Sequence, residues 1–226
     1  MNAIHKPIVA IIGGTGALGS GLATRWAEAG YDVIIGSRSL SSANAGIARI
    51  RETLSARGIH APKLRPMENE AAAAAGEIAV LTVPYSSQKE TLEQIRSALR
   101  GKVLVDVTVP LAPPKAGTVH LPPEGSAGQA AQALLGEDVQ VVSAFQNVAA
   151  HHLHRQGKIH CDVLVCGNRK DAREIVIALV EAAGMRGFHA GPIENAAVAE
   201  AMTSVLITMN RQYKCHAGIM ITGLEE

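Results

Sequence analysis

The chain has 226 residues, of which 47% are hydrophobic and 18% charged, a composition that excludes disorder as its main state. Its 21 Lys and Arg balance 20 Asp and Glu, and only 3% of its residues are aromatic, so neither a basic nucleic-acid footprint nor a base-stacking platform is expected. Three cysteines without CxxC spacing argue against a secreted disulfide framework, and no apolar stretch reaches the ~20 residues of a membrane span, so we expect a cytoplasmic protein with no nucleic-acid or membrane partner.

Short apolar runs alternate with helical patterns through the first half of the chain. We expect strands over residues 8–12, 32–35, 63–65, 78–82 and 103–106, separated by helices over residues 22–29, 41–57, 71–75 and 86–100. Gly30 and Gly58 are expected to end two of these helices, and Ser41 or Ser42 to cap the start of the second. This alternation predicts a parallel sheet with helices on both faces.

The second half opens with a Pro- and Gly-rich loop over residues 110–126, and long loops of this kind are usually functional. The predicted elements that follow are a helix over 127–135, strands over 140–145 and 162–166, a helix over 170–183, a strand over 186–190 and a C-terminal helical segment. The span 196–209 is apolar enough to be buried against the core or a second subunit. The whole pattern predicts an α/β fold of the Rossmann type, a doubly wound and mostly parallel sheet with a small C-terminal helical extension.

The sharpest motif is a glycine-rich turn, Gly14-Thr15-Gly16-Ala17-Leu18-Gly19, which fits GxGxxG between a buried strand and a helix. We expect Gly14 to permit the tight turn, Gly16 to let the backbone approach a diphosphate, and Gly19 to let the helix pack on the strand. The free N–H groups of the helix start favour phosphate, and the Thr15 hydroxyl is a further donor. The motif therefore predicts a dinucleotide site.

The end of the second strand indicates which dinucleotide binds. It reads Gly36-Ser37-Arg38-Ser39, without the carboxylate that usually holds the ribose 2′-hydroxyl of NAD. A guanidinium and neighbouring hydroxyls suit a 2′-phosphate, which a carboxylate would repel. The sequence favours NADP(H) over NAD(H).

The later strand ends supply few groups for acid–base chemistry. Val83 and Pro84 are expected to pack against the cofactor, and Asp106 is either functional or a satisfied polar group. Tyr85 and Lys89 fit the YxxxK pair of short-chain dehydrogenases, but they follow the fourth strand and we interpret the match as accidental. A short-chain-type NADPH carbonyl or imine reductase, with Tyr85 or a histidine as proton donor, stays an alternative, as does an NADP sensor without turnover. No catalytic side chain is expected if hydride passes directly between two rings.

Three histidines, His151, His152 and His154, follow the sixth strand. Their spacing does not place all three on one helix face and no carboxylate lies among them, so we expect a solvated helix start and not a metal site. Cys161 and Cys166 are five residues apart on a strand, which points them to opposite faces as packed thiols.

With these residues in view, the chain resembles the family of NADPH-dependent coenzyme F420 reductases (F420H2:NADP oxidoreductases). The resemblance runs over nearly the whole length, and the segments that carry it are Gly13–Gly19, Ile35–Arg38, Ala79–Pro84, Val142–Phe145, Val165–Gly167 and Ala190–Ile193.

The resemblance implies that NADPH binds along Gly14–Gly19 with Ser37 and Arg38 on its 2′-phosphate, and that Val83, Pro84 and Tyr85 lie near the nicotinamide. It further implies that the deazaflavin ring of F420 stacks on the nicotinamide near Gln146, Asn147 and Val148, in a homodimer. The family commonly has a histidine in place of Gln146, so FMN or FAD stays open as the acceptor. We expect an NADP-binding core over residues 1–145, with residues 146–226 completing the acceptor site and the dimer interface.

Overall fold

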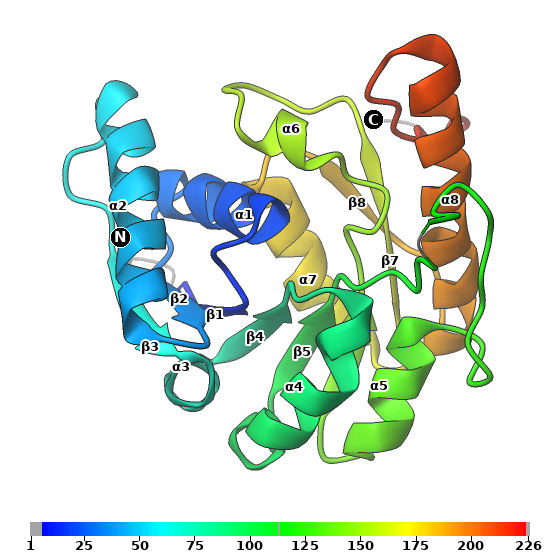
Figure 1. Ribbon diagram of the computed structural model, residues 1–226, viewed down its shortest axis with the longest axis horizontal. Helices are drawn as coiled ribbons and strands as arrows, with labels where there is room; N and C mark the ends of the chain where they lie inside the picture. The colour runs from blue at the N-terminus through cyan, green and yellow to red at the C-terminus, as the bar shows by residue number, and fades with distance from the viewer. Residues whose placement is uncertain (1–5, 113, 225–226) are drawn as a thin grey trace.

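The computed structural model describes residues 6–112 and 114–224, and it contains one eight-stranded sheet in the order β3-β2-β1-β4-β5-β6-β7-β8 (Figure 1). The strands are β1 (Val9–Ile12), β2 (Val33–Ser37), β3 (Leu64–Glu68), β4 (Ile78–Leu81), β5 (Val103–Asp106), β6 (Gln140–Ser143), β7 (Asp162–Gly167) and β8 (Arg186–His189). All neighbouring strands are parallel except β6 and β7, which are antiparallel. The predicted doubly wound, mostly parallel sheet is confirmed.

Helices cover both faces of the sheet. They are α1 (Ala17–Glu28), α2 (Leu40–Ala56), α3 (Asn69–Ala75), α4 (Gln88–Ile95), α5 (Ala127–Leu135), α6 (Ala150–Leu153), α7 (Lys170–Ala182) and α8 (Ala196–Tyr213), with short 3₁₀ turns η1 (Tyr85–Ser87), η2 (Arg96–Leu99) and η3 (Ile193–Asn195). One apolar core joins the sheet to α1, α2, α6 and α7, and the other joins it to α3, α4, α5 and the start of α8. No helix in the described ranges is long and apolar enough to cross a membrane.

The buried strands divide their side chains between these two cores because successive residues of a strand point to opposite faces. In β1, Val9 and Ile11 belong to the first core, and Ala10 and Ile12 to the second. Cys161 and Cys166 are divided in the same way, which confirms their predicted orientation. A sheet buried on both faces explains why its strands read as unbroken apolar runs.

Several element boundaries differ from the sequence predictions. The cap of α2 is Ser39, whose Oγ accepts a hydrogen bond from Ser42 N at 3.3 Å, so the predicted caps at Ser41 and Ser42 are wrong by two or three residues. The helix expected over residues 86–100 is divided into η1, α4 and η2. The strand expected over residues 140–145 ends at Ser143, because Phe145 adopts a positive φ of 72° and leaves the sheet. Gly30 and Gly58 end their helices with positive φ, as predicted.

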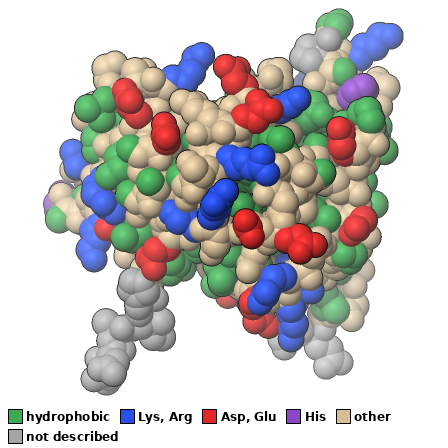
Figure 2. Space-filling model, turned by 90° about the horizontal axis from the view of Figure 1, so that it is seen from below, with side chains coloured by type: hydrophobic (Ala, Val, Ile, Leu, Met, Phe, Trp, Pro, Cys, Tyr) green, Lys and Arg blue, Asp and Glu red, His purple; other side chains and the backbone are tan. Residues whose placement is uncertain are grey.

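Charges on the face seen in Figure 2 are mixed: Lys and Arg lie interspersed with Asp and Glu, and no single sign dominates that view. This agrees with the nearly balanced composition, +1 overall.

Candidate functional site

The carboxyl ends of β1, β4, β5 and β6 lie level along one rim of the sheet. In the strand register, Ile12 pairs with Leu81, Leu81 with Asp106, and Asp106 with Ser143. The chain between β1 and α1, and the segments that leave β4, β5 and β6, therefore start from this rim. In open α/β sheets this is where ligands bind, at the point where the strand order reverses.

The tight turn after β1 depends on Gly13. Its φ is +75°, and a Cβ there would lie 2.7 Å from Val83 Cγ1. Gly14, which the sequence analysis expects to permit the turn, is not among the residues with positive φ. Gly14 is required by close packing instead, since its Cβ would lie 2.9 Å from Ile11 O.

Gly16 and Gly19 have different surroundings. Gly19 packs α1 against the sheet: a Cβ there would lie 2.7 Å from Thr82 Oγ1 and 2.9 Å from Gly14 Cα, as expected for close helix–strand contact. Gly16 is exposed and caps α1, and its Cβ would meet nothing closer than Gly13 O at 3.8 Å. The protein itself leaves this space open, directly before the free N–H groups of the helix start. Such a cradle fits a diphosphate.

Asn69, at the start of α3, also shapes the turn, and the sequence reasoning missed it. Its buried Oδ1 accepts a hydrogen bond from Gly13 N at 3.2 Å. Gly14 N donates to Gly36 O at 2.9 Å, so the turn is tied to the end of β2 as well. These bonds hold the turn in place before any ligand arrives. No sequence signal marks Asn69, which lies 56 residues from its partner.

The end of β2 forms a second polar patch. Ser37 is buried, whereas Arg38 is exposed and has no ion-pair partner among the described residues. Beyond Arg38, the hydroxyl of Ser39 lies 3.2 Å from that of Ser41 and 2.9 Å from that of Ser42, at the start of α2. A free guanidinium beside hydroxyls and a helix N-terminus can bind a phosphate monoester.

The chain after β4 places Val83 and Tyr85 half-buried and Pro84 exposed. Burial raises the pKa of the Tyr85 phenol, and the carboxylates of Glu124, Glu200 and Asp106 raise it further. Lys89 is exposed, and its Nζ lies 4.0 Å from Glu93 Oε1. In a short-chain reductase the lysine lowers the tyrosine pKa, so a raised pKa does not fit that role.

A buried polar network lies beneath the ends of β5 and β6. Gln88 Nε2 donates to Asp106 Oδ2 at 2.6 Å and to Thr108 Oγ1 at 2.9 Å, and Thr108 N donates to Asp106 Oδ1 at 2.9 Å. Burial raises the pKa of Asp106, and these bonds oppose the rise. Asp106 is thus a satisfied polar group at a strand end, one of the two readings that the sequence left open.

Glu200 of α8 joins the same network, and the sequence reasoning missed it. Its carboxyl accepts hydrogen bonds from Ala127 N at 2.6 Å and Gly128 N at 3.0 Å, at the start of α5. It is only 1% exposed. Burial raises its pKa to about 7, although the two backbone bonds oppose the rise, and nearby Asp106 adds to it. The available signal was one carboxylate inside an otherwise apolar segment.

Gln146, Asn147 and Val148 are all buried. Gln146 Nε2 donates to Asp106 O at 2.9 Å and to Ser143 Oγ at 2.8 Å, but its buried Oε1 accepts no hydrogen bond from the described residues. Asn147 Nδ2 donates to Asp162 O at 2.7 Å. The three residues line a cavity of about 160 Å³ together with side chains of α8, among them Thr203 and Asn210. An unsatisfied buried acceptor beside a cavity fits a ligand that brings an N–H or O–H donor.

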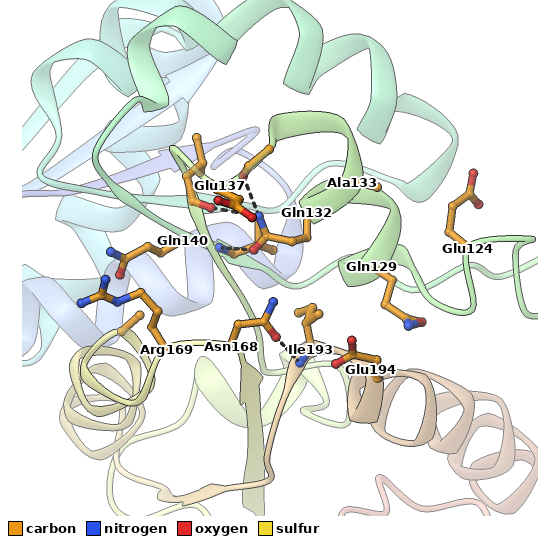
Figure 3. A pocket seen from close by; sticks show the side chains of 14 residues that line it. Glu124, Gln129, Gln132, Ala133, Glu137, Gln140, Asn168, Arg169, Ile193 and Glu194 are labelled. Carbon is orange, nitrogen blue, oxygen red and sulfur yellow. Dashed lines mark hydrogen bonds between the residues drawn. The ribbon is translucent and has the colours of Figure 1, made fainter.

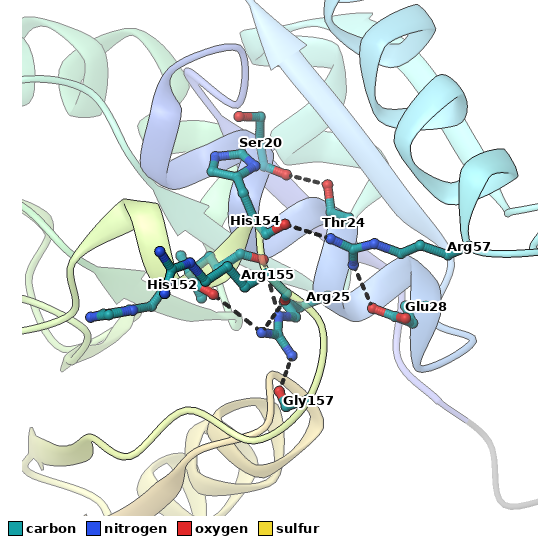
Figure 4. Close-up of polar contacts among 10 residues, drawn as sticks. Ser20, Thr24, Arg25, Glu28, Arg57, His152, His154, Arg155 and Gly157 are labelled. Atoms are coloured by element: carbon teal, nitrogen blue, oxygen red, sulfur yellow. Dashed lines mark hydrogen bonds and ion pairs between the residues drawn. The ribbon is translucent and has the colours of Figure 1, made fainter.

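The histidine segment packs against the start of α1 (Figure 4). Arg25, which is buried in α1, donates to four backbone carbonyls of this segment, those of His152, Leu153, Arg155 and Gly157. Burial lowers the pKa of its guanidinium. His154 Nε2 lies 3.1 Å from Ala17 O. His151 of the short helix α6 and His154 directly after it are exposed, as the predicted solvated helix start requires, whereas His152 is half-buried. Among the described residues, no three His, Cys, Asp or Glu side chains have a metal-binding arrangement.

A larger hollow of about 820 Å³ lies elsewhere, between α5, the start of α7 and η3 (Figure 3). It includes Gln140 at the amino end of β6, so it does not open on the rim with the glycine turn. Its amides are engaged by the chain itself: Gln132 Nε2 donates to Gly136 O at 2.7 Å, and Asn168 Oδ1 accepts from Ile193 N at 3.1 Å. We therefore do not assign the cofactor site to it.

The doubly wound sheet, the glycine turn at the strand-order reversal and the open cradle at Gly16 define a dinucleotide-binding protein of the Rossmann class. Residues 8–110 match the family model described as "NADP oxidoreductase coenzyme F420-dependent". The chain is 40% identical over 223 residues to the F420-dependent NADP reductase of Methanocaldococcus jannaschii, an alignment that covers 96% of this chain and 99% of that protein. It is 38% identical to the reductase of the same name from Methanothermobacter thermautotrophicus, with 96% of each chain covered.

The chain therefore belongs to the F420-dependent NADP reductase family. Among solved structures, a putative F420-dependent NADP reductase from Arthrobacter sp. FB24 superposes with a TM-score of 0.78 at 23% identity, covering 95% of this chain and 99% of that one. An imine reductase from Bacillus cereus BAG3X2 superposes with a TM-score of 0.64 at 20% identity, covering 92% of this chain and 63% of that one. At these identities the likeness shows a shared fold.

Proposed function

We propose that this protein transfers hydride directly between NADP(H) and the deazaflavin of coenzyme F420. The observation that carries this proposal is the near full-length similarity to F420-dependent NADP reductases. The open cradle at Gly16, next to the start of α1, supports the NADP half. When both are bound, NADPH supplies the hydride and F420 accepts it with one proton.

In this proposal, the backbone of Gly14, Thr15, Gly16, Ala17, Leu18 and Gly19 holds the diphosphate, and Ser37 and Arg38 hold the 2′-phosphate. Replacing Arg38 by alanine removes the only guanidinium of this patch. We expect the KM for NADPH to rise more than about tenfold, the ~1.4 kcal/mol of one lost charge-assisted contact, while the KM for NADH stays within about twofold. Arg49→Ala, which removes an exposed cation from the middle of α2, is the matched control. Equal changes for both dinucleotides contradict the assignment.

The acceptor half of the proposal uses two segments of the rim. Val83, Pro84 and Tyr85 flank the nicotinamide end, and Gln146, Asn147 and Val148 face the deazaflavin. The unsatisfied Oε1 of Gln146 supports this proposal, because it offers an acceptor to a ring N–H or hydroxyl. The chain's task in such a reaction is to hold two rings at about 3–3.5 Å and keep water out. Buried Phe145 and Val148, beside the network of Asp106, give this part of the rim a rigid wall.

The acceptor is tested by mixing the protein with NADPH under anaerobic conditions and recording the absorbance of F420, FMN or FAD, or the loss of NADPH with carbonyl and imine compounds. Rapid bleaching of F420 and little of FMN or FAD supports the proposal. The short-chain-type alternative is not favoured, because Lys89 is exposed beside Glu93 and the Tyr85 pKa is raised. Turnover with a carbonyl compound alone contradicts the F420 assignment, and binding without turnover favours an NADP sensor.

We also propose a homodimer formed through one face of α8. Large apolar side chains stand exposed at Val198 (62%), Val205 (46%) and Met209 (40%), beside Leu121 (48%) of the loop over 110–126. Their spacing along α8 gives one apolar stripe, which a second copy would cover. Light scattering should show a dimer, and Val205→Lys should give a monomer.

Two further expectations stay predictions. One is the division of the chain at residue 145, with residues 146–226 completing the acceptor site. The other is the cytoplasmic location.

A further inference from the structure

A compact group of basic side chains lies where α6 meets the C-terminal tail. The rings of His151 and His216 stack with centroids 4.5 Å apart at 21°, and His152 Nε2 lies 3.0 Å from His216 O. His152, His154, Arg155 and His216 all interact electrostatically with His151. We call these five residues the basic surface. It brings together two segments that are more than 60 residues apart in the sequence.

Within the part of the chain that the structure describes, the two segments that form the basic surface contain no acidic side chain. No Asp or Glu occurs over residues 139–161 or 201–224, and five of the nine histidines lie in these two segments. None of the ion pairs among the described residues involves the surface. Two acidic residues of neighbouring segments are paired with other cations: Glu28 with Arg57 at 2.8 Å, and Asp162 with Arg186 at 2.7 Å. A cluster of imidazole and guanidinium donors that makes no ion pair among the described residues can bind anionic groups.

The basic surface is also fixed in place, next to the proposed site. The Arg25 guanidinium donates hydrogen bonds to four backbone carbonyls of the segment that contains α6, and His154 Nε2 lies within hydrogen-bond distance of Ala17 O at the start of α1. On the other side, Ala149 and Ala217, which adjoin α6 and His216, line the cavity with Gln146. The surface therefore borders both the glycine turn and the cavity of the acceptor half. Side chains on a preordered segment bind with a smaller entropic cost.

We propose that the basic surface binds the anionic tail of the deazaflavin co-substrate, a phosphodiester followed by glutamate carboxylates. This rests on the proposed function, and it names the part of the co-substrate that the ring cavity does not hold. A chain of negative charges fits a row of imidazole and guanidinium donors. The diphosphate of NADP(H) is held elsewhere in the proposal, at the backbone of the glycine turn.

The pH dependence of tail binding follows from the groups around His151. Arg155 holds the pKa of His151 below its usual range, with smaller contributions from burial, His216, His152 and His154. Two further cations lie beneath the segment: Arg25 of α1 bonds the carbonyls of His152 and Arg155, and Arg57, which follows α2, bonds the carbonyl of His154. Bound anions favour protonated imidazoles, so tail binding takes up protons. The KM for F420 should therefore rise as the pH rises and His151 loses its proton.

The test compares F420 with the same deazaflavin nucleoside that lacks the phosphate and the glutamates, using full-length protein. In the double variant His151→Ala/Arg155→Ala, we expect the KM for F420 to rise at least about tenfold, while the KM values for the tail-free acceptor and for NADPH stay within about twofold. Arg100→Ala, an exposed cation beside the amino end of β5, is the control and should change none of them. Should the double variant not fold, added salt must raise the wild-type KM for F420 and not for the tail-free acceptor.

Each outcome decides the proposal. A selective rise for F420 supports it, and so does a selective salt effect on wild-type protein. If the KM values for both acceptors rise equally, the surface contributes to ring binding and the proposal is overturned. If only the KM for NADPH rises, the surface binds the dinucleotide phosphates and the proposal is also overturned. Unchanged KM values also overturn it. If wild-type protein reduces neither deazaflavin, the proposed function fails as well, whereas turnover of both without tail dependence leaves that function intact.

Discussion

Adding one methyl group at Gly16 or at Gly19 separates ligand binding from packing in the glycine turn. At Gly16 the backbone φ is −71°, which alanine adopts without strain, and the new Cβ would meet nothing closer than 3.8 Å. At Gly19 the new Cβ would lie 2.7 Å from Thr82 Oγ1 and 2.9 Å from Gly14 Cα. One of these neighbours is backbone and cannot move aside cheaply.

The two variants should therefore behave in opposite ways. Gly19→Ala overfills a packed contact, which costs about 1–3 kcal/mol of the free energy of unfolding. In a chain of this size that corresponds to a Tm lower by about 2–10 °C. Gly16→Ala should change the free energy of unfolding by less than about 1 kcal/mol, because the lost preference for glycine at a helix start is offset by the stiffer unfolded chain. Its methyl group fills the cradle, so the Kd for NADPH should rise at least about tenfold.

The measurements are thermal unfolding without ligand and calorimetric titration with NADPH. Gly21→Ala is a useful second packing control, because its Cβ would lie 2.7 Å from Leu153 Cβ, on the side of α1 that faces α6. The reasoning is refuted if Gly16→Ala binds NADPH as tightly as wild-type protein, since the cradle would then hold no phosphate. It is also refuted if Gly19→Ala is as stable as wild-type protein.

Two further predictions concern buried charges. Because the Glu200 pKa is raised from 4.5 to about 7, its ionisation weakens the folded state, so stability is greatest at low pH and is lost as pH rises through this range, by about 3 kcal/mol in all. Urea unfolding of Glu200→Gln at about pH 5 and about pH 8 should show a pH dependence smaller by about 2.5 kcal/mol, the part of this change that falls between the two pH values, and an unchanged dependence would contradict the raised pKa. Arg25→Met leaves four carbonyls of residues 152–157 without their donor, so we expect a loss of at least about 3 kcal/mol and rapid proteolysis of this segment. Arg57→Met, which loses Glu28 and the His154 carbonyl, should have the smaller effect, and intact protection in Arg25→Met would argue against the anchor.

The positions of the strands could be predicted because burial on both faces leaves continuous apolar runs such as Val9–Ile12 and Val33–Ile35. The direction of β7 could not, because its pairing with β6 is set by contacts distant in sequence. The two adjacent glycines, Gly13 and Gly14, read alike in the sequence, and only the fold decides that the first takes the positive φ.

Those parts of the candidate site that are formed by residues close together in the sequence could be predicted, and the parts formed by distant residues could not. The glycine turn is formed by neighbouring residues, so its motif could be read directly. Arg25 and Glu200 act through backbone groups 127–132 and 72–73 residues away, which no spacing rule reveals. Their only sequence signal is a charge within a helix face that is otherwise apolar.

The reversal of β7 has a consequence for engineering this scaffold. Because β7 runs antiparallel to β6, its amino end lies toward the rim, and there Asp162 binds the C-terminal tail: its N donates to Ile219 O at 2.8 Å, and its Oδ2 accepts from Ile221 N at 2.6 Å. An affinity tag attached to this tail would therefore act on the cavity that Gln146 lines, because Ala217 of the same tail is part of the cavity wall.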